Sequence, residues 1–244
     1  MKWYFILILT IVLSCNEKEL KTASVAFYNL ENLFDTEPDS SSINEPFTPE
    51  GEKKWDQVGY TNKLKNLAKV IGELANGGAP TFLGVCEVEN KKVLEDLIAQ
   101  PSLKKENYAI VHIDSPDERG IDVGFIYKKS IFTVEHFTAH QPDLSYCKDL
   151  TRDILHVQGK VINGETLHFI INHWPSRGGG SEASESKRIA AATTLNNIKV
   201  SILKTEPNAK IIVMGDFNDE PSDKSIAEVL DVSCNQSNTA KGQF

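Results

Sequence analysis

The stretch Ile154–His173, ILHVQGKVINGETLHFIINH, decides the fold class of this chain. Two apolar runs rich in β-branched residues flank Asn163-Gly164, and an Asn-Gly pair between such runs predicts a β-hairpin with a tight turn of the primed type. Strand and helix patterns elsewhere do not alternate as regular βαβ units. The sequence therefore predicts an α+β protein with antiparallel sheet and flanking helices.

Apolar runs on both sides of the hairpin predict the other elements. A short apolar run bounded by turn residues predicts a strand, and apolar residues at i, i+3 and i+4 predict a helix. Strands are expected over 23–29, 81–86, 108–113, 123–127, 131–137 and 209–214. Helices are expected over 60–75, around 93–98 and over 182–203, with a short helix from residue 221.

The composition is that of an ordinary globular protein. The chain has 244 residues, of which 40% are hydrophobic and 25% charged, and its formal net charge is −8. These values exclude a disordered, collagen-like or disulfide-dense chain and fit one domain or at most two small ones. The acidic balance argues mildly against a broad basic face for nucleic acid, because such binding relies on many Lys and Arg contacts to phosphates.

The N-terminal stretch 1–14, MKWYFILILTIVLS, is typical of a secretory signal peptide. It is too short to span a bilayer, which takes about 20 apolar residues. The junction VLSC ends at Cys15 and resembles a bacterial lipobox, which implies cleavage before Cys15 and lipidation of its thiol. An ordinary signal peptide with an incidental cysteine is the alternative. We expect residues 15–22 to be a polar tether, and the protein to be exported and lipid-anchored in the bacterial cell envelope, at the outer membrane or the periplasmic face.

Four strand ends carry polar side chains that suit one site. The residues are Asn29, Glu87, His173 and the pair Asp216 and Asn218, each at or just past the carboxyl end of an expected strand. If these strands lie side by side, their ends converge on one edge, where the backbone fixes side chains that still face solvent. A single residue of this kind is usually a turn former or a cap. Four with the same placement indicate a site.

The chemistry of this set favours a hard cation. Carboxylate and amide oxygens suit Mg²⁺ or Mn²⁺, and an imidazole beside them could hydrogen-bond a phosphoryl oxygen. Zinc is disfavoured, because the sequence has no His/Cys cluster at ligand spacing. The remaining histidines have no partner pattern and are expected to be surface or sheet residues: His112, His136, His140, His156 and His168.

Five segments resemble motifs of the endonuclease/exonuclease/phosphatase superfamily, the deoxyribonuclease I-like fold. They are Phe27–Asn32 (FYNLEN), Gly84–Asn90 (GVCEVEN), Arg119–Gly124 (RGIDVG), Asn172–Arg177 (NHWPSR) and Gly215–Asp219 (GDFND). NHWPSR and RGIDV are similar to a branch of exported bacterial proteins. The resemblance implies one domain over 23–244, built as a four-layer α/β/β/α sandwich of two mixed, mainly antiparallel sheets.

The resemblance also implies a role for each strand-end residue. Glu87 is expected to be the main metal carboxylate, with Asn29 beside it. Asp216 is expected to bind the metal and to orient or deprotonate the attacking water. Asn218 is expected to bind the scissile phosphate and to help place the metal, and His173 to contact a phosphoryl oxygen. Together they would support in-line attack of a metal-assisted water on a phosphate ester, in an endonuclease, exonuclease, phosphodiesterase or phosphatase.

Three further side chains are expected to contact phosphate or substrate. Arg177 leads into Gly178-Gly179-Gly180, where a guanidinium could clamp a phosphate bidentately, although a solvated loop cation is the alternative. Arg152 lies at the head of a strand and could face the site. Tyr127 matches a region where the family often places a phosphate-contacting aromatic, although tyrosine in a strand usually serves packing.

The chain departs from the family pattern at its C-terminus. The family usually closes with a further strand that carries an Asp-His or Asp-Gln pair, and residues 219–244 contain no histidine. The polar ending 233–244 lacks the apolar alternation of a strand. We therefore expect the fold to be incomplete at its C-terminal end.

Two functions from different classes remain open. The first is a divalent-metal-dependent hydrolase on the cell envelope that acts on nucleic acid, nucleotides, or lipid or sugar phosphates. The second is a non-catalytic or weakly active binding lipoprotein that keeps the fold without the closing pair. In both, the membrane is contacted through the lipid anchor at Cys15, and the sequence indicates no obligate protein partner.

Overall fold

The computed structural model describes residues 22–37 and 45–232, and the strands within these ranges form two four-stranded sheets. The first sheet has the order β1-β2-β4-β3 and the second the order β5-β6-β7-β8. The β1–β2 and β7–β8 pairs are parallel, and the other pairs are antiparallel. The strands are β1 (Val25–Leu33), β2 (Phe82–Val88), β3 (Tyr108–His112), β4 (Asp122–Lys128), β5 (Phe132–His140), β6 (Ile154–Val161), β7 (Thr166–His173) and β8 (Lys210–Asp216).

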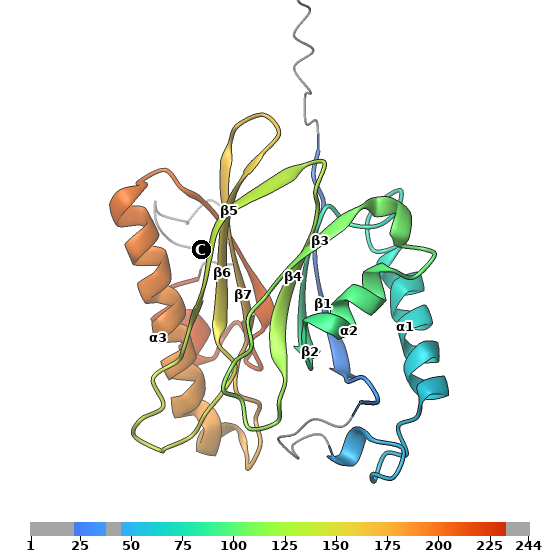
Figure 1. Ribbon diagram of the computed structural model, residues 1–244. Helices are drawn as coiled ribbons and strands as arrows, with labels where there is room; N and C mark the ends of the chain where they lie inside the picture. The colour runs from blue at the N-terminus through green and yellow to red at the C-terminus, as the bar shows by residue number, and fades with distance from the viewer. Residues whose placement is uncertain (1–21, 38–44, 233–244) are drawn as a thin grey trace, which may run out of the picture.

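Helices cover the outer face of each sheet (Figure 1). The helices α1 (Gln57–Ile71) and α2 (Lys91–Ile98) pack on the first sheet, and α3 (Ser181–Thr205) packs on the second. The shorter helical turns are η1 (Glu45–Phe47), η2 (Lys104–Glu106) and the π-helical η3 (Ser225–Val229). The α+β class and the four-layer sandwich of two mixed, mainly antiparallel sheets are therefore confirmed.

The core consists of three apolar layers, because each sheet is buried on both faces. The middle layer lies between the sheets and contains a group of phenylalanines. The ring centroid of Phe169 lies 4.6 Å from that of Phe82 and 4.7 Å from that of Phe125, within the range of favourable aromatic pairs. One outer layer joins α1 and α2 to the first sheet, and the other joins α3 to the second.

The predicted hairpin joins β6 and β7, but its turn is not of the primed type. Gly164 donates to the carbonyl of Val161 at 2.8 Å, and the Val161 amide donates to the carbonyl of Glu165 at 3.0 Å. Gly164 has a φ of 87°, whereas Asn163 is not among the residues with positive φ. A primed type I turn needs positive φ at both central residues. The loop is instead a three-residue connection in which glycine alone adopts the left-handed conformation.

Strand direction brings the predicted site residues to one end of the molecule. Because β1 and β2 are parallel, Asn29 pairs with Cys86, directly before Glu87. Because β7 and β8 are parallel, His173 pairs with Asp216. The carboxyl ends of one pair of strands in each sheet thus lie at the same edge of the sandwich.

Several sequence predictions fall outside the described residues. These are the signal peptide 1–14, the lipidation site Cys15, the tether as far as residue 21 and the polar ending 233–244. Among the residues that the structure describes, no helix combines the length and apolar character needed to cross a bilayer.

Candidate active site

The predicted site residues meet around the side chain of Asn29. Its Nδ2 lies 3.2 Å from Oε1 of Glu87 in the first sheet and 3.2 Å from Oδ2 of Asp216 in the second. The Oδ1 of Asn29 accepts from the backbone amide of Glu31 at 2.8 Å. One amide group therefore fixes the relative position of two carboxylates that come from different sheets. We call the group Asn29, Glu87, His173, Asp216 and Asn218 the carboxylate edge.

An irregular backbone aims the Glu87 carboxylate at this edge. The pairing of β2 with β4 shifts register between Cys86 and Val88, and Glu87 between them has a φ of 58°. Such a left-handed conformation costs a glutamate on the order of 1–3 kcal/mol, and strain of this kind collects at functional sites. Asn218 has a φ of 51° and is aimed in the same way.

His173 is buried against the Glu87 carboxylate. Its side chain is 3% exposed, and its Nε2 lies 3.8 Å from Oε1 of Glu87. Burial, followed by the positive charges of Arg152 and Arg119, lowers the pKa of His173 to about 2. The ring is therefore neutral near pH 7, and its buried Nδ1 has no hydrogen-bond partner among the described residues.

Asp216 and Asn218 line an open cavity of about 570 Å³ together with Asn29 and Arg177. The backbone amide of Asn218 donates to Oδ1 of Asp216 at 3.1 Å, and its Nδ2 donates to the carbonyl of Trp174 at 3.0 Å. Both oxygens of Asp216 thus accept a hydrogen bond, which fixes the orientation of its carboxylate. The cavity gives a substrate access to this side of the carboxylate edge.

Arg177 lies at the rim of this cavity, with its side chain 38% exposed. Its Nε donates to the carbonyl of Asn218 at 2.9 Å, and its Nη2 donates to Oδ2 of Asp223 at 2.6 Å. The guanidinium therefore reaches the site, but it pairs with a carboxylate there.

Arg152 is buried beneath the carboxylate edge and does not line the cavity. It pairs with Asp117 at 3.0 Å and donates to the carbonyls of His173 at 3.2 Å and Trp174 at 2.6 Å. All three nitrogens of its guanidinium are engaged with protein groups. Arg152 therefore fixes the end of β7, which carries His173.

The structure does not bring Tyr127 to the carboxylate edge. Tyr127 pairs with Phe82 at the far end of β2, and its ring packs 5.6 Å from that of Phe132. Because β4 runs antiparallel to β2, its first residue lies near the edge instead. That residue, Asp122, accepts from the Ser115 amide at 2.8 Å and contacts Nε2 of His112 at 3.0 Å.

Sequence reasoning assigned no role to three residues around the site. The Cys86 sulfur lies within 4.8 Å of ligand atoms of both His173 and Asp216. Burial, followed by the charges of Asp216 and Glu87, raises the pKa of this thiol. Asp117 pairs with Arg152, and Arg119 contributes positive charge near His173. Cys86 reads as a core residue within an apolar strand, whereas the RGIDVG segment, which begins at Arg119 and closely follows Asp117, could have signalled the other two.

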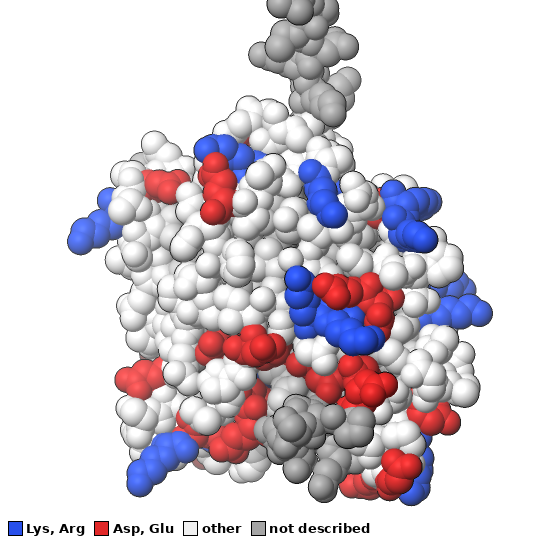
Figure 2. Space-filling view, in the orientation of Figure 1, with Lys and Arg blue, Asp and Glu red and all other residues white. Residues whose placement is uncertain are grey.

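The donor set fits a hard divalent cation better than a soft one. Glu87 and Asp216 offer carboxylate oxygens, and Mg²⁺ is commonly held by one or two carboxylates with waters completing its shell. Burial raises the pKa of the Cys86 thiol, which disfavours the thiolate form that binds soft metals. Asn29 directs its NH₂ group toward both carboxylates, so the two acids supply the anionic donors. Figure 2 shows further Asp and Glu side chains gathered toward the lower end of the molecule, where β1 and β2 terminate.

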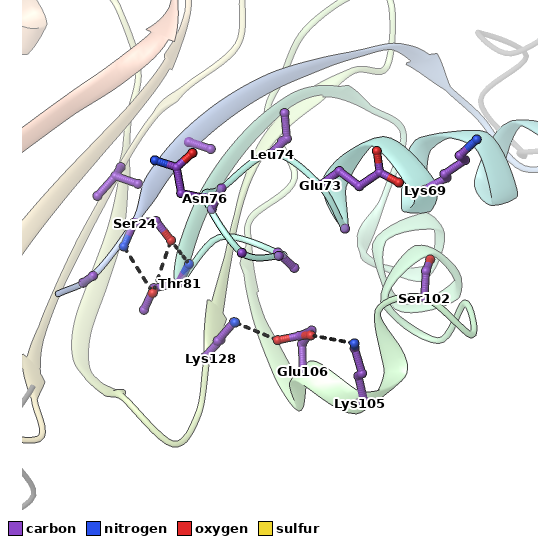
Figure 3. Close-up of a pocket in the computed structure, with 18 of the residues that line it drawn as sticks. Ser24, Lys69, Glu73, Leu74, Asn76, Thr81, Ser102, Lys105, Glu106 and Lys128 are labelled. Atoms are coloured by element: carbon purple, nitrogen blue, oxygen red, sulfur yellow. Dashed lines mark hydrogen bonds and ion pairs between the residues drawn. The ribbon is translucent and has the colours of Figure 1, made fainter. Parts of the chain in front are cut away.

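A second cavity, of about 810 Å³, lies at the opposite end of β1 and β2 (Figure 3). Several of its polar side chains pair with one another. The Ser24 and Thr81 hydroxyls lie 3.5 Å apart, and Lys128 pairs with Glu106 at 2.6 Å. Because these groups are already paired across the cavity, the carboxylate edge is the stronger candidate for chemistry.

One protein-family model matches almost the whole chain. Residues 24–244 match the model of the "Endonuclease/Exonuclease/phosphatase family". No relative was found among curated proteins.

Solved structures share the fold at low identity. TDP2 from C. elegans is 16% identical with a TM-score of 0.56, and the match covers 82% of this chain and 49% of that one. A Bacteroides thetaiotaomicron endonuclease/exonuclease/phosphatase family protein is 15% identical with a TM-score of 0.56, over 86% of this chain and 66% of that one. ANGEL2, described as a 2',3'-cyclic phosphatase, is 15% identical with a TM-score of 0.56, over 91% and 60%. The chain thus spans about half to two thirds of the length of these structures.

Proposed function

This chain belongs to the endonuclease/exonuclease/phosphatase family, and we propose that it hydrolyses phosphate esters with Mg²⁺ or Mn²⁺ bound at the carboxylate edge. One observation carries the proposal. The Asn29 amide holds carboxylates from both sheets at 3.2 Å, beside the neutral His173 and an open cavity. Two acids converging on one point concentrate negative charge, which a divalent cation would balance.

Glu87 and Asp216 would hold the cation. A bound divalent cation would polarise the phosphate and offset charge that develops on its oxygens. Asp216 would also orient the attacking water, since its carboxylate is held by both Asn29 and Asn218. A water held in line with the scissile bond gains rate from orientation alone.

His173 and Asn218 would contact the phosphate. A neutral imidazole carries one ring proton, which His173 can donate to a phosphoryl oxygen. Asn218 lines the cavity, and Arg177 at its rim could attract the substrate's negative charge. No covalent intermediate on the protein is needed, because the water attacks phosphorus directly.

Hydrolysis of bis-p-nitrophenyl phosphate by the full chain tests this proposal. With Mg²⁺ or Mn²⁺ we expect turnover that falls about 10²- to 10³-fold in Glu87→Gln and in Asp216→Asn, as for loss of one preorganised electrostatic group. Glu95→Gln is the matched control, because Glu95 is an exposed carboxylate on α2. If turnover is absent, or equal in the wild type and all three variants, the proposed enzymatic activity is overturned in favour of a non-catalytic binding protein.

We further propose that the protein is exported and anchored to the bacterial envelope by a lipid at Cys15. Residues 1–14 and the VLSC junction support this placement. The substrate would then be a phosphate ester at or outside the membrane: a nucleic acid, a nucleotide, or a lipid or sugar phosphate. Cys15→Ser should move the protein from the membrane fraction to the soluble one, and persistence in the membrane would contradict the anchor. Assays with plasmid DNA, nucleotides and phospholipid vesicles would separate the substrate classes.

A further inference from the structure

The chain enters the fold at the end of the sandwich opposite the carboxylate edge. Thr22, the first residue that the structure describes, lines the cavity of Figure 3 together with Ser24, just before β1 begins. The carboxylate edge lies at the other end of the same strands. β7 has 8 residues from Thr166 to His173, so at about 3.3 Å per residue its two ends lie roughly 23 Å apart. About one strand length therefore separates the candidate site from the point where the chain enters.

Lysine is the commoner charged residue at this end, which we call the lysine end. Its lysines lie on the cavity wall or at strand ends beside it: Lys69, Lys105, Lys128, Lys129, Lys160 and Lys210. Glu106, Glu135 and Glu165 each pair with one of these lysines, and Glu73 is the other acid among the described residues that line the cavity. The lysines outnumber the glutamates. The opposite end has the reverse balance, since Asp and Glu side chains gather there (Figure 2).

Exposed apolar side chains accompany the lysines. Val25 opens β1, Leu74 lines the same cavity, and Ile162 lies at the turn between β6 and β7. Single exposed apolar residues are ordinary on a protein surface. Lysines interleaved with them suit the boundary between lipid headgroups and water, where an ammonium meets phosphate while apolar groups contact lipid.

The length of the tether limits how the domain can sit on a membrane that holds Cys15. Thr22 follows Cys15 by 7 residues, and a fully extended chain gains at most about 3.6 Å per residue, or about 25 Å in all. For the carboxylate edge to face that membrane, the tether would have to run straight along the sandwich and past the loops beyond the end of β1. These loops include η1 (Figure 1). The tether is too short for that arrangement.

We propose that the lysine end faces the anionic lipid surface to which Cys15 anchors the protein, and that the carboxylate edge hydrolyses dissolved phosphate esters, an inference that rests on the proposed function. Attraction of the lysines to anionic headgroups and repulsion of the acidic end act in the same direction. The substrate class narrows to water-soluble esters such as nucleic acids, nucleotides and sugar phosphates. Phospholipids of the anchoring bilayer are excluded.

Quenching of a fluorescent label at the lipid surface tests the orientation. The lipidated full-length protein is reconstituted in vesicles of phosphatidylglycerol and phosphatidylcholine that carry a headgroup quencher. Labels are attached in a Cys147→Ser/Cys234→Ser background, either at Lys105→Cys on the lysine end or at Lys224→Cys near the rim of the site cavity. We expect several-fold stronger quenching at position 105. Equal quenching at both positions, or stronger quenching at 224, would overturn the proposal.

Charge reversal tests whether the lysines contact the lipid. Lys129→Glu/Lys210→Glu should bring the ratio of the two quenching signals toward one, and so should high salt, which screens exposed charges. Lys91→Glu/Lys92→Glu is the matched control, because these exposed lysines open α2 directly after the carboxyl end of β2. A ratio that is unchanged in Lys129→Glu/Lys210→Glu would overturn the lysine end as the lipid-facing surface.

Substrate assays on the same vesicles separate this inference from the proposed function. With Mg²⁺ present, we expect the anchored protein to hydrolyse dissolved bis-p-nitrophenyl phosphate at the same rate as soluble Cys15→Ser protein, and to leave the vesicle phospholipid intact. Hydrolysis of the phospholipid would overturn the inference and keep the proposed hydrolase. Turnover of neither ester would overturn the hydrolase, and the quenching ratio would still decide the orientation. A protein without lipid at Cys15 would overturn the orientation together with the anchor, but not the hydrolysis.

Discussion

The carboxylate edge takes its side chains from the ends of strands. His140, His156 and His168 lie on the outer face of the second sheet instead, and this group, which we call the histidine face, comes from within β6 and β7 and from the last residue of β5. At the edge, left-handed backbone at Glu87 and Asn218 aims the groups. On the face, ordinary strand alternation places His156 and His168 side by side. Irregular backbone thus aims side chains into an open cavity, whereas regular sheet packs the rings of His156 and His168 against each other.

The two regions also differ in charge. The edge gathers carboxylates around a single amide, whereas the face holds a bonded pair of imidazoles, His156 and His168, with one carboxylate, Glu206, on His168. The edge therefore depends on buried charge for its shape, and the histidine face does not. Three changes should affect the two regions differently. We expect the effect on stability to be largest for loss of a buried charge, smaller for a change in backbone spacing and smallest for a change in pH.

Removing the charge beneath the carboxylate edge should have the largest effect. Arg152→Met leaves Asp117 buried without its partner and removes donors from the His173 and Trp174 carbonyls. We expect the free energy of unfolding to fall by about 3–5 kcal/mol in urea titrations. Lys160→Met is the matched control, since it breaks an exposed pair with Glu135 on the second sheet and should cost about 1 kcal/mol or less. Equal losses in the two variants would remove Arg152 from its supporting role.

Backbone spacing at the edge is tested by a smaller change. A Cβ on Gly215 would press on the Asn172 carbonyl oxygen and lie 2.6 Å from the Asn172 Cβ. Gly215→Ala should therefore cost about 1–3 kcal/mol of unfolding free energy through overpacking between β7 and β8. It should also reduce hydrolysis by displacing the neighbouring Asp216. Gly178→Ala meets only Ser176 Oγ at 3.6 Å and serves as the control. If the two alanine variants are equally stable, the close approach of β7 and β8 does not depend on a glycine at position 215.

The contrast between the regions explains how much the sequence could predict. Asn29, Glu87, His173 and Asp216 each follow an apolar run, and such runs end at the edge of a sheet, so their convergence was predictable. Their catalytic roles stay predictions. Tyr127 was misplaced because the resemblance matched its region of sequence but not the direction of its strand, and β4 runs antiparallel to β2.

The sequence did not reveal the histidine face, and the reason is a different one. His140, His156 and His168 are separated by irregular intervals, so no ligand spacing appears in the sequence. Their meeting depends on the register of β5, β6 and β7, including an irregularity between Val134 and His136. Register comes from packing on both faces of the sheet, which a single sequence does not give. His156 and His168 are sheet residues, one of the two placements expected for them, and both are buried.

The pH dependence of stability gives the smallest test and isolates the histidine face. Folded His156 has a pKa of about 4, below its usual 6.5, so the unfolded chain binds its proton first as the pH falls. Between pH 6.5 and pH 4, the free energy of unfolding therefore decreases as the pH is lowered, by at most about 1.4 kcal/mol per pH unit for this group. His173 acts in the same direction, whereas burial raises the pKa of Asp153 to about 6 and opposes both below that pH.

Urea unfolding between pH 7 and pH 4.5 in the presence of chelator measures this slope. His156→Gln removes one of the groups, so its stability should fall less steeply than that of the wild type below pH 6.5. His136→Gln controls for loss of an exposed imidazole on the same face, and because His136 supplies the smallest part of the lowering of the His156 pKa, it should flatten the slope much less than His156→Gln does. Since His173 and Asp153 remain in every variant, their contributions cancel in the comparison. Parallel slopes for wild type and His156→Gln would mean that His156 takes up its proton as readily in the folded protein as in the unfolded chain, and that the histidine face is wetter than its packing indicates.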